Sequence, residues 1–306
     1  MISPMYLVKK ISRSEFVSIR KLQYHVQVWG EPAPGKTPLV LLHGWMDVAA
    51  SYQFLVDALS HDHYVIAPDW RGFGQTTTSG VDSFWFPDYL GDLDALLDHY
   101  APDAKVNLVG HSMGGNVAMI YAGVRPERIR RLVNLEGFGM PATQPSEAPG
   151  RYAKWLDEIK ALRQGELTPR GYDSAAGVAQ RLMKTNPRLG QDKARWLATH
   201  WAREDADGRW LILGDPAHKI INAQLYRLDE VLAVFEHITL PVLMVEASDD
   251  SMSFWWKGKL TMAQHRERLQ RVPQLEIARI ENSGHMLHHD QPENLARLIE
   301  RFIGAQ

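Results

Sequence analysis

The chain has 306 residues, of which 45% are hydrophobic and 23% are charged, and its formal net charge is −2. This composition is typical of a globular protein, and the near balance of charge argues against nucleic acid or an anionic membrane as the main partner. Because the chain contains no cysteine, disulfides, thiolate metal sites and cysteine nucleophiles are excluded.

The first half of the chain alternates short apolar runs with longer helical patterns, which is typical of a parallel sheet with crossover helices. Tyr24–Trp29 alternates polar and apolar residues, as a half-exposed strand does. Uniformly apolar runs indicate strands that are covered on both faces. Such strands are expected at Pro38–Leu42, Tyr64–Ala67, Val106–Val109 and Arg131–Leu135, with helices between them at Tyr52–Leu59, Tyr89–Tyr100 and Met113–Val124.

The pattern changes after residue 136. Three prolines fall within Pro141–Pro149, which is typical of a linker, and the stretches beyond it carry apolar residues at helical spacing. Strand patterns return at Pro241–Val245 and Leu275–Ile280, and a helix at Pro292–Ile303 ends the chain. We expect an α/β core in two parts, residues 1–136 and 237–306. A mostly helical insertion, residues 137–236, lies between them.

The strongest chemical signal is Gly110-His111-Ser112-Met113-Gly114, directly after one predicted strand and directly before a predicted helix. This is the context that a G-x-S-x-G nucleophile elbow requires. A sharp turn exposes the serine hydroxyl, and the flanking glycines let neighbouring backbone approach. The sequence therefore predicts Ser112 as a nucleophile.

The second motif, His43-Gly44-Trp45, follows the strand Pro38–Leu42. Here the chain can turn back and aim the Trp45 N–H at the nucleophile. The helix N-terminus offers the Met113 N–H from the other side, and two such amides can stabilise an oxyanion. We expect Trp45 and Met113 to form the oxyanion hole, whereas the His43 imidazole is expected only to hold the turn.

A third motif, Asp69-Trp70-Arg71-Gly72-Phe73-Gly74, follows the strand Tyr64–Ala67. Its glycines indicate turn geometry. We therefore interpret it as scaffold, with an ion pair between Asp69 and Arg71, rather than as part of the catalytic machinery.

His285, in Ser283-Gly284-His285, follows the last predicted strand and is the expected general base. His288 and His289 lie three and four positions further on, which raises the question of a metal site. Apart from Asp290, no nearby carboxylate or thiol completes a zinc pattern. His288 and His289 are therefore expected at the surface or rim, and no metal is expected.

The imidazole needs a carboxylate to fix its tautomer, and two candidates follow predicted strands. Glu136 ends the strand Arg131–Leu135, and Asp250 follows Pro241–Val245. The residues alone leave both open. The order serine, acid, histidine along the chain is the order used by α/β-hydrolases.

With HGW, DWRGFG, GHSMGG and SGH in this order, the chain resembles the α/β-hydrolase superfamily over essentially its whole length. It is most similar to the branch that includes haloalkane dehalogenases, epoxide hydrolases, meta-cleavage C–C hydrolases and serine-hydrolase-like proteins. Within that branch, Phe86–Leu93, Leu135–Gly139 and the long insertion point to the serine-hydrolase-like group. The resemblance implies the α/β-hydrolase fold, with a helical cap inserted after the sixth strand.

Two departures from the family pattern bear on the chemistry. Dehalogenases and most epoxide hydrolases carry an aspartate at the elbow, so Ser112 disfavours those activities. Most members place the acid in a G-x-x-D pattern, but Ala247 stands where that glycine would be, and Asp250 fits imperfectly. Some dehalogenases place a glutamate after the sixth strand, as Glu136 would be. We favour Glu136 and retain Asp250 as the alternative.

The predicted function is hydrolysis of a carboxylic ester through a Ser–His–acid triad, with a small apolar or aromatic substrate and no cofactor or metal. Cap residues Trp155, Trp196, Trp201 and Trp210 either line an apolar pocket or pack the cap internally. The alternatives are a C–C bond hydrolase with the same triad and a non-catalytic ligand-binding receptor. The sequence shows no secretory signal pattern or membrane-length apolar run, so a cytoplasmic protein is expected, and homo-oligomer formation stays open.

Overall fold

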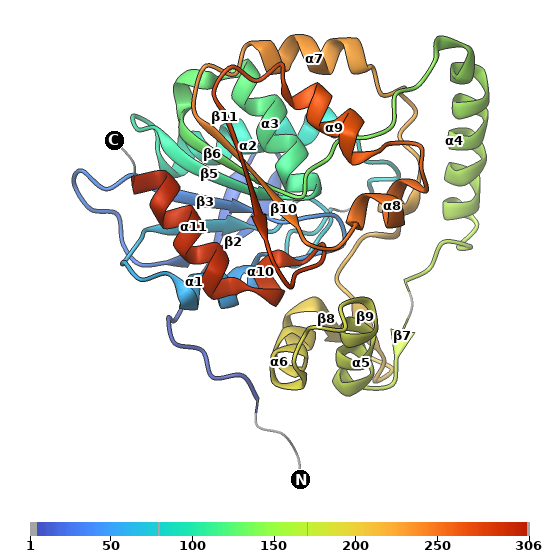
Figure 1. The fold of residues 1–306 in the computed structure, drawn as a ribbon. Coiled ribbons are helices and arrows are strands. Elements are labelled where there is room, and N and C mark those ends of the chain that lie inside the picture. The colour runs from blue at the N-terminus through green and yellow to red at the C-terminus, as the bar shows by residue number, and fades with distance from the viewer. Residues whose placement is uncertain (1–4, 79, 170, 305–306) are drawn as a thin grey trace.

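The computed structural model describes residues 5–78, 80–169 and 171–304 (Figure 1). An eight-stranded sheet with the order β1-β2-β4-β3-β5-β6-β10-β11 forms its centre. β2 runs antiparallel to both of its neighbours, whereas the strands from β4 to β11 run parallel to one another. The strands are β1 (Arg13–Ile19), β2 (Leu22–Trp29), β3 (Leu39–Leu42), β4 (Val65–Pro68), β5 (Val106–His111), β6 (Ile129–Leu135), β10 (Val242–Ala247) and β11 (Leu275–Ile280). The predicted α/β fold with a mostly parallel sheet is confirmed.

Helices cover both faces of the sheet. One face carries α1 (Gln53–Ala58), α10 (Leu287–Asp290) and α11 (Pro292–Gly304), and the other carries α2 (Phe86–Tyr100), α3 (Met113–Val124), α7 (Leu228–Glu236) and α9 (Met262–Leu269). The side chains of β3 show why the strand is uniformly apolar. Val40 and Leu42 belong to the core on the α2 and α3 side, whereas Leu39 and Leu41 belong to the core against α1 and α11.

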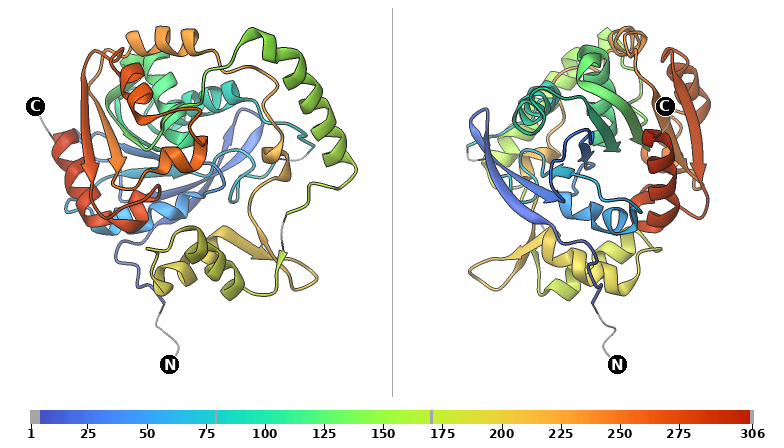
Figure 2. Two further views of the ribbon diagram at one scale, coloured as in Figure 1. Left: turned by 45° about the vertical axis from the view of Figure 1, so that its right-hand side comes forward. Right: turned by 90° about the vertical axis from the view of Figure 1, so that its left-hand side faces the viewer.

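The segment between β6 and β10 lies largely apart from the sheet (Figures 1 and 2). Its elements are α4 (Ala148–Arg163), β7 (Gly171–Tyr172), α5 (Ala175–Thr185), α6 (Gln191–Trp201), β8 (Ala202–Glu204) and β9 (Trp210–Ile212). The three short strands form a separate antiparallel sheet in the order β7-β9-β8, which the sequence analysis did not predict. α5, α6 and this small sheet form one lobe, and α4 runs separately along the side of the molecule.

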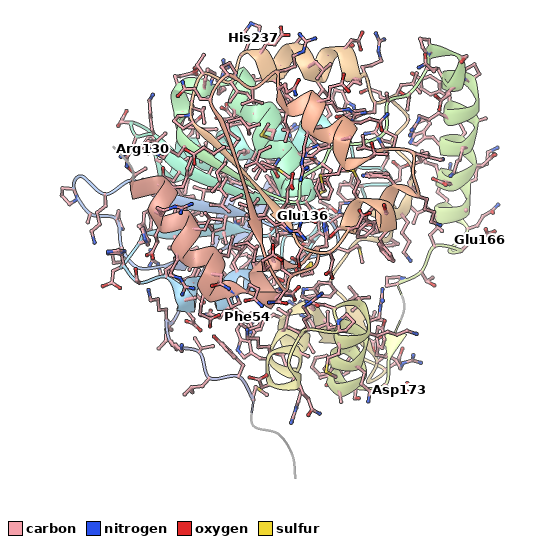
Figure 3. All side chains as sticks on the ribbon, viewed as in Figure 1. Phe54, Arg130, Glu136, Glu166, Asp173 and His237 are labelled. Atoms are coloured by element: carbon pink, nitrogen blue, oxygen red, sulfur yellow. The ribbon has the colours of Figure 1, made fainter. Side chains whose placement is uncertain are left out.

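The last helix of that segment belongs with the core. α7 packs on α3 so closely that a Cβ added to Gly123 would lie 2.2 Å from the carbonyl oxygen of Val234. The predicted insertion, residues 137–236, therefore includes one helix that packs against the core. The lobe itself meets the core around Phe54, whose ring lies 5.6 Å from Trp196 and 5.5 Å from His289 (Figure 3).

The turn after β4 holds two buried ionic groups, but not in the predicted pairing. Asp69 Oδ2 lies 2.7 Å from Nδ1 of His25 and accepts the Gln75 N–H, and Oδ1 accepts the Ala49 N–H. The expected Asp69–Arg71 ion pair is therefore wrong. Asp69 instead ties the turn to β2 and to the start of the segment before α1.

Arg71 pairs with Asp92 of α2. Its Nε and Nη2 lie 2.6 Å from the two carboxylate oxygens of Asp92, and the Tyr24 hydroxyl donates to the same carboxylate at 2.6 Å. The Asp92 side chain is fully buried. Because a buried carboxylate needs such partners, this pair fixes α2 against the turn after β4.

Among the described residues, no helix combines the length and the apolar character needed to span a bilayer.

Replacing Asp92 with Asn should destabilise the protein by about 3 kcal/mol, because the mostly buried Arg71 guanidinium loses its two 2.6 Å contacts with a buried carboxylate and keeps only the 3.2 Å ion pair with Asp88. Asp98→Asn is the matched control, since Asp98 pairs with Arg128 but its side chain is 63% exposed, and its loss should cost less than about 1 kcal/mol. Urea unfolding of both variants measures the difference. Equal losses of stability would contradict the assigned role of Asp92.

Candidate active site

Ser112 occupies the turn between β5 and α3. Its backbone angles, φ 51° and ψ −113°, lie in a region that non-glycine residues rarely adopt. Backbone closes in on the two flanking glycines. A Cβ on Gly110 would lie 2.4 Å from the Gly114 oxygen, and one on Gly114 would lie 2.2 Å from the Leu42 oxygen. Glycine at both positions therefore permits a turn that holds Ser112 at the carboxyl end of β5.

Three predicted site residues come together at this end of the sheet. The Ser112 hydroxyl oxygen lies 3.0 Å from Nε2 of His285. Nδ1 of His285 lies 3.3 Å from Oε2 of Glu136, at the long end of the hydrogen-bond range. The other carboxylate oxygen of Glu136 accepts the Ala247 N–H at 2.7 Å, and Glu136 is only 2% exposed. Hydroxyl, imidazole and carboxylate thus form one continuous chain of polar contacts.

The direction of the Glu136 side chain follows from the turn after β6. Glu136 itself adopts a left-handed conformation, with φ 56°. The Asn134 side chain then closes the turn, because its Oδ1 accepts the Gly137 N–H at 2.9 Å and its Nδ2 donates to the Gly137 oxygen at 3.0 Å. The carboxylate is therefore turned toward the end of β10.

Asp250, the alternative acid, has another role in the structure. It lies at the N-terminus of α8 (Ser251–Trp256), where its Oδ1 accepts the Ser253 N–H at 2.9 Å. Hydrogen bonds from Ser253 lower the pKa of the exposed Asp250 carboxyl. Among the described residues, Glu136 is the carboxylate within hydrogen-bond distance of His285.

The His43-Gly44-Trp45 turn lies against the nucleophile. A Cβ on Gly44 would lie 3.1 Å from the Cβ of Ser112. His43 is buried, and burial lowers its pKa. Its Nδ1 lies 2.7 Å from the Gly44 oxygen and its Nε2 accepts the Trp70 N–H at 2.8 Å, so the imidazole holds the turn as expected.

His288 and His289 are buried, so their expected place at the surface is wrong. They lie on the short helix α10, which is enclosed between the core and the inserted lobe. The His111 ring packs between the rings of His285 and His288, at 4.8 and 4.6 Å. Nε2 of His111 donates to the His285 carbonyl oxygen at 2.7 Å, and burial keeps the pKa of His111 well below its ordinary value. His111 thereby fixes the backbone of the histidine that faces Ser112.

Potential metal ligands gather at two places among the described residues. Each group places three ligand atoms within 4.8 Å of one another: Asp47, His111 and His288 in the interior, and His61, His63 and Glu300 at the surface. In the interior group, Oδ2 of Asp47 and Nε2 of His288 lie 3.7 Å apart.

The inserted lobe is tied to the loops that carry the site. The contacts are Arg188 with Asp249 at 2.6 and 3.0 Å, Asn186 with Asp290 at 2.7 Å, and the Trp201 indole N–H with Asp47 at 2.9 Å. These contacts reach the loop after β10, helix α10 and the turn after β3. The lobe therefore contacts two loops and one short helix near Ser112.

Three of the four tryptophans singled out from the sequence join the inserted segment to the core, and the fourth, Trp210, lines a cavity beside the lobe. Trp196 packs on Phe54, Trp201 donates to Asp47, and Trp155 donates to Ser83. One aromatic residue beside the catalytic candidates that the sequence analysis missed is Trp255 of α8. Its ring lies 5.5 Å from that of His285, and it is 47% exposed.

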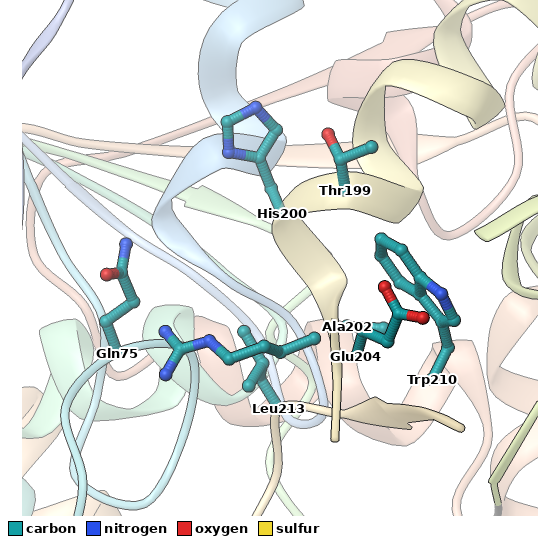
Figure 4. A pocket seen from close by; sticks show the side chains of 8 residues that line it. Gln75, Thr199, His200, Ala202, Glu204, Trp210 and Leu213 are labelled. Carbon is teal, nitrogen blue, oxygen red and sulfur yellow. The ribbon is translucent and has the colours of Figure 1, made fainter. Parts of the chain in front are cut away.

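A cavity of about 430 Å³ opens beside the inserted lobe (Figure 4). Its walls include Gln75 from the core and His200, Glu204 and Trp210 from the lobe. Ser112, Glu136 and His285 are not among its lining residues, so this cavity is separate from the polar chain described above.

Comparison with known proteins places the chain in a family. Residues 37–292 match the family model for the alpha/beta hydrolase fold. The chain is 28% identical to a serine hydrolase-like protein of Danio rerio, over 92% of this chain and 85% of that protein. It is 26% identical to a cis-3-alkyl-4-alkyloxetan-2-one decarboxylase of Shewanella oneidensis, again over 92% of this chain and 85% of the relative.

A solved structure of a hypothetical protein from Pseudomonas aeruginosa PAO1 has the same fold. The two superpose with a TM-score of 0.80 at 23% identity, covering 95% of this chain and 98% of the other. The matched range includes Ser112, Glu136 and His285. The chain therefore belongs to the α/β hydrolase family.

Proposed function

We propose that this protein hydrolyses carboxylic esters, with Ser112 as nucleophile, His285 as general base and Glu136 as the acid that orients the base. The observation that carries the proposal is the continuous chain from the Ser112 hydroxyl through both His285 nitrogens to the Glu136 carboxylate, at 3.0 and 3.3 Å. Nucleophile, base and orienting acid in this arrangement are the parts that acyl transfer requires.

In the proposed reaction, His285 Nε2 takes the hydroxyl proton as Ser112 attacks the ester carbonyl. Glu136 accepts the Nδ1–H and stabilises the imidazolium that forms. His285 then gives the proton to the leaving alcohol, and an acyl-enzyme remains on Ser112. A water molecule activated by the same imidazole releases the carboxylic acid and restores the serine.

The oxyanion of the tetrahedral intermediate would be held by the amides of Trp45 and Met113. Two features support this part of the proposal. The Gly44 turn packs against Ser112, and Met113 is the first residue of α3, whose N-terminal amides lack helical partners. Amide donors that are fixed in place before charge develops are the condition for efficient electrostatic stabilisation.

The substrate we propose is a small molecule with an apolar group beside the ester. Trp255 supports this because a half-exposed indole next to His285 offers apolar surface at the site. The substrate in the name of the Shewanella relative also supports an apolar ester. An oxetan-2-one is a cyclic ester, and the one in that name carries two alkyl groups. We propose that residues 137–236 act as a cap, because the lobe contacts two loops and helix α10 near Ser112.

Ser112→Ala should lower kcat for a p-nitrophenyl ester by on the order of 10⁵-fold, since the side chain that forms the acyl-enzyme is lost. Ser18→Ala, at an exposed serine of β1, is the matched control and should retain full activity. Circular dichroism checks that both variants fold. Turnover by Ser112→Ala within tenfold of the wild-type value would overturn the nucleophile assignment.

Glu136→Gln should lower kcat by roughly 10³–10⁴-fold, because the amide no longer stabilises the imidazolium and favours the wrong tautomer. Asp250→Asn should leave kcat within about tenfold of wild type and stability nearly unchanged, since Asn caps a helix as well as Asp does. Steady-state kinetics of both variants on the same ester gives the comparison. The opposite order of losses would assign the acid to Asp250.

A further inference from the structure

Two histidines and a glutamate gather at the surface, away from Ser112. His61 and His63 lie in the loop between α1 and β4, and Glu300 lies on α11. Nδ1 of His61 and Nε2 of His63 each lie 3.1 Å from the same carboxylate oxygen, Oε1 of Glu300. The loop precedes β4, whereas Ser112 follows β5, and these strands share one direction in the sheet. The group is therefore at the opposite edge of the sheet from the proposed reaction.

The spacing of these three side chains suits a tetrahedral metal ion. Zinc binds imidazole nitrogen and carboxylate oxygen at about 2.0–2.2 Å, which places neighbouring ligand atoms roughly 3.3 Å apart. The two observed separations of 3.1 Å differ from that value by only a few tenths of an ångström. All three ligand atoms also lie within 4.8 Å of one another, so one ion can contact them together.

The carboxylate is already held in place by other groups. The Ser60 N–H and hydroxyl donate to Oε2 of Glu300 at 3.2 and 2.6 Å, and the His61 N–H donates to Oε1 at 2.9 Å. A carboxylate that is oriented in this way loses little freedom when it binds an ion.

The histidines are accessible and their loop is braced. The His61 side chain is 77% exposed, and both histidines line a cavity of about 350 Å³. Lys10 Nζ donates to the carbonyl oxygens of Leu59 and His61 at 2.8 and 3.2 Å, which fixes the loop between α1 and β4. The Lys10 ammonium group repels a metal cation. A metal ion would therefore have to be held by direct bonds to the ligand atoms rather than by long-range electrostatic attraction.

We propose that His61, His63 and Glu300 form a binding site for one zinc ion or a similar divalent transition metal ion. Solvent from the adjoining cavity supplies the remaining ligand. Such an ion would join the loop after α1 to α11, between ligands that lie 239 and 237 positions apart in the chain. It would stabilise the folded protein, since it binds the folded arrangement and not the separated segments. The proposal is independent of the ester hydrolysis proposed above.

The full chain is titrated with Co²⁺, whose visible absorption reports four-coordinate binding, and with Zn²⁺ in competition. One ion should bind per chain, and about 100 µM Zn²⁺ should raise the Tm by roughly 2 °C or more, reversibly with a chelator. His61→Ala and His63→Ala should each weaken Co²⁺ binding at least tenfold. His237→Ala removes an exposed histidine at the end of α7 and should bind as the wild type does.

Two results would overturn the proposal. One is the absence of Co²⁺ absorption and of a Tm shift in the wild-type protein. The other is binding that persists unchanged in both His61→Ala and His63→Ala, which would place the ion elsewhere, with the interior group of Asp47, His111 and His288 as the next location to test.

Discussion

The left-handed backbone at Ser112 is the constraint on which the site depends. A non-glycine residue in this conformation costs about 1–3 kcal/mol, so surrounding structure must enforce it. Here β5 enters the turn at Gly110, and α3 leaves it with Gly114 pressed against the backbone of β3. Any side chain at either glycine would push β3, β5 and α3 apart. The close packing of three elements thus fixes the position of one hydroxyl.

A second turn with a positive φ follows the neighbouring strand, β6. β5 and β6 are adjacent and parallel, so the residues that follow them come out at the same edge of the sheet. Glu136 after β6 also has a positive φ, and its side chain bonds to the amide of Ala247 at the end of β10. His285, which follows β11, reaches back over β10 to lie between Ser112 and Glu136. The sheet order therefore brings together residues that lie 173 and 149 positions apart in the chain.

Much of this arrangement could be predicted from local sequence, because the buried parallel strands are mostly apolar and the elbow has its own glycine pattern. The choice between Glu136 and Asp250 could not be made that way. Both residues follow strands. Which of the two carboxylates lies beside His285 depends on the left-handed turn at Glu136 and on the start of α8 at Asp250. β1 was missed because its alternating Arg-Ser-Glu-Phe-Val-Ser-Ile sequence lies half exposed at the sheet edge.

Contacts between distant segments were the hardest to foresee. Asp69 bonds to His25 because β2 pairs with β4, which places His25 beside the residue that follows β4, and nothing near Asp69 in the chain indicates this. Two adjacent histidines, His288 and His289, are predicted from the sequence to lie at the surface. The inserted lobe covers α10, however, and both histidines are buried. Trp255 gains its place beside His285 only through the direction of α8. In each case the partner is supplied by a segment far away in the sequence.

The central claim is that Ser112 is an activated nucleophile, and covalent labelling tests it most directly. The folded protein is treated with a fluorophosphonate, and the modified residue is located by tandem mass spectrometry. We predict one adduct per chain, on the oxygen of Ser112, and no adduct after His285→Ala under the same conditions. Absence of an adduct in the wild-type protein, or an adduct on a different residue, would contradict the account.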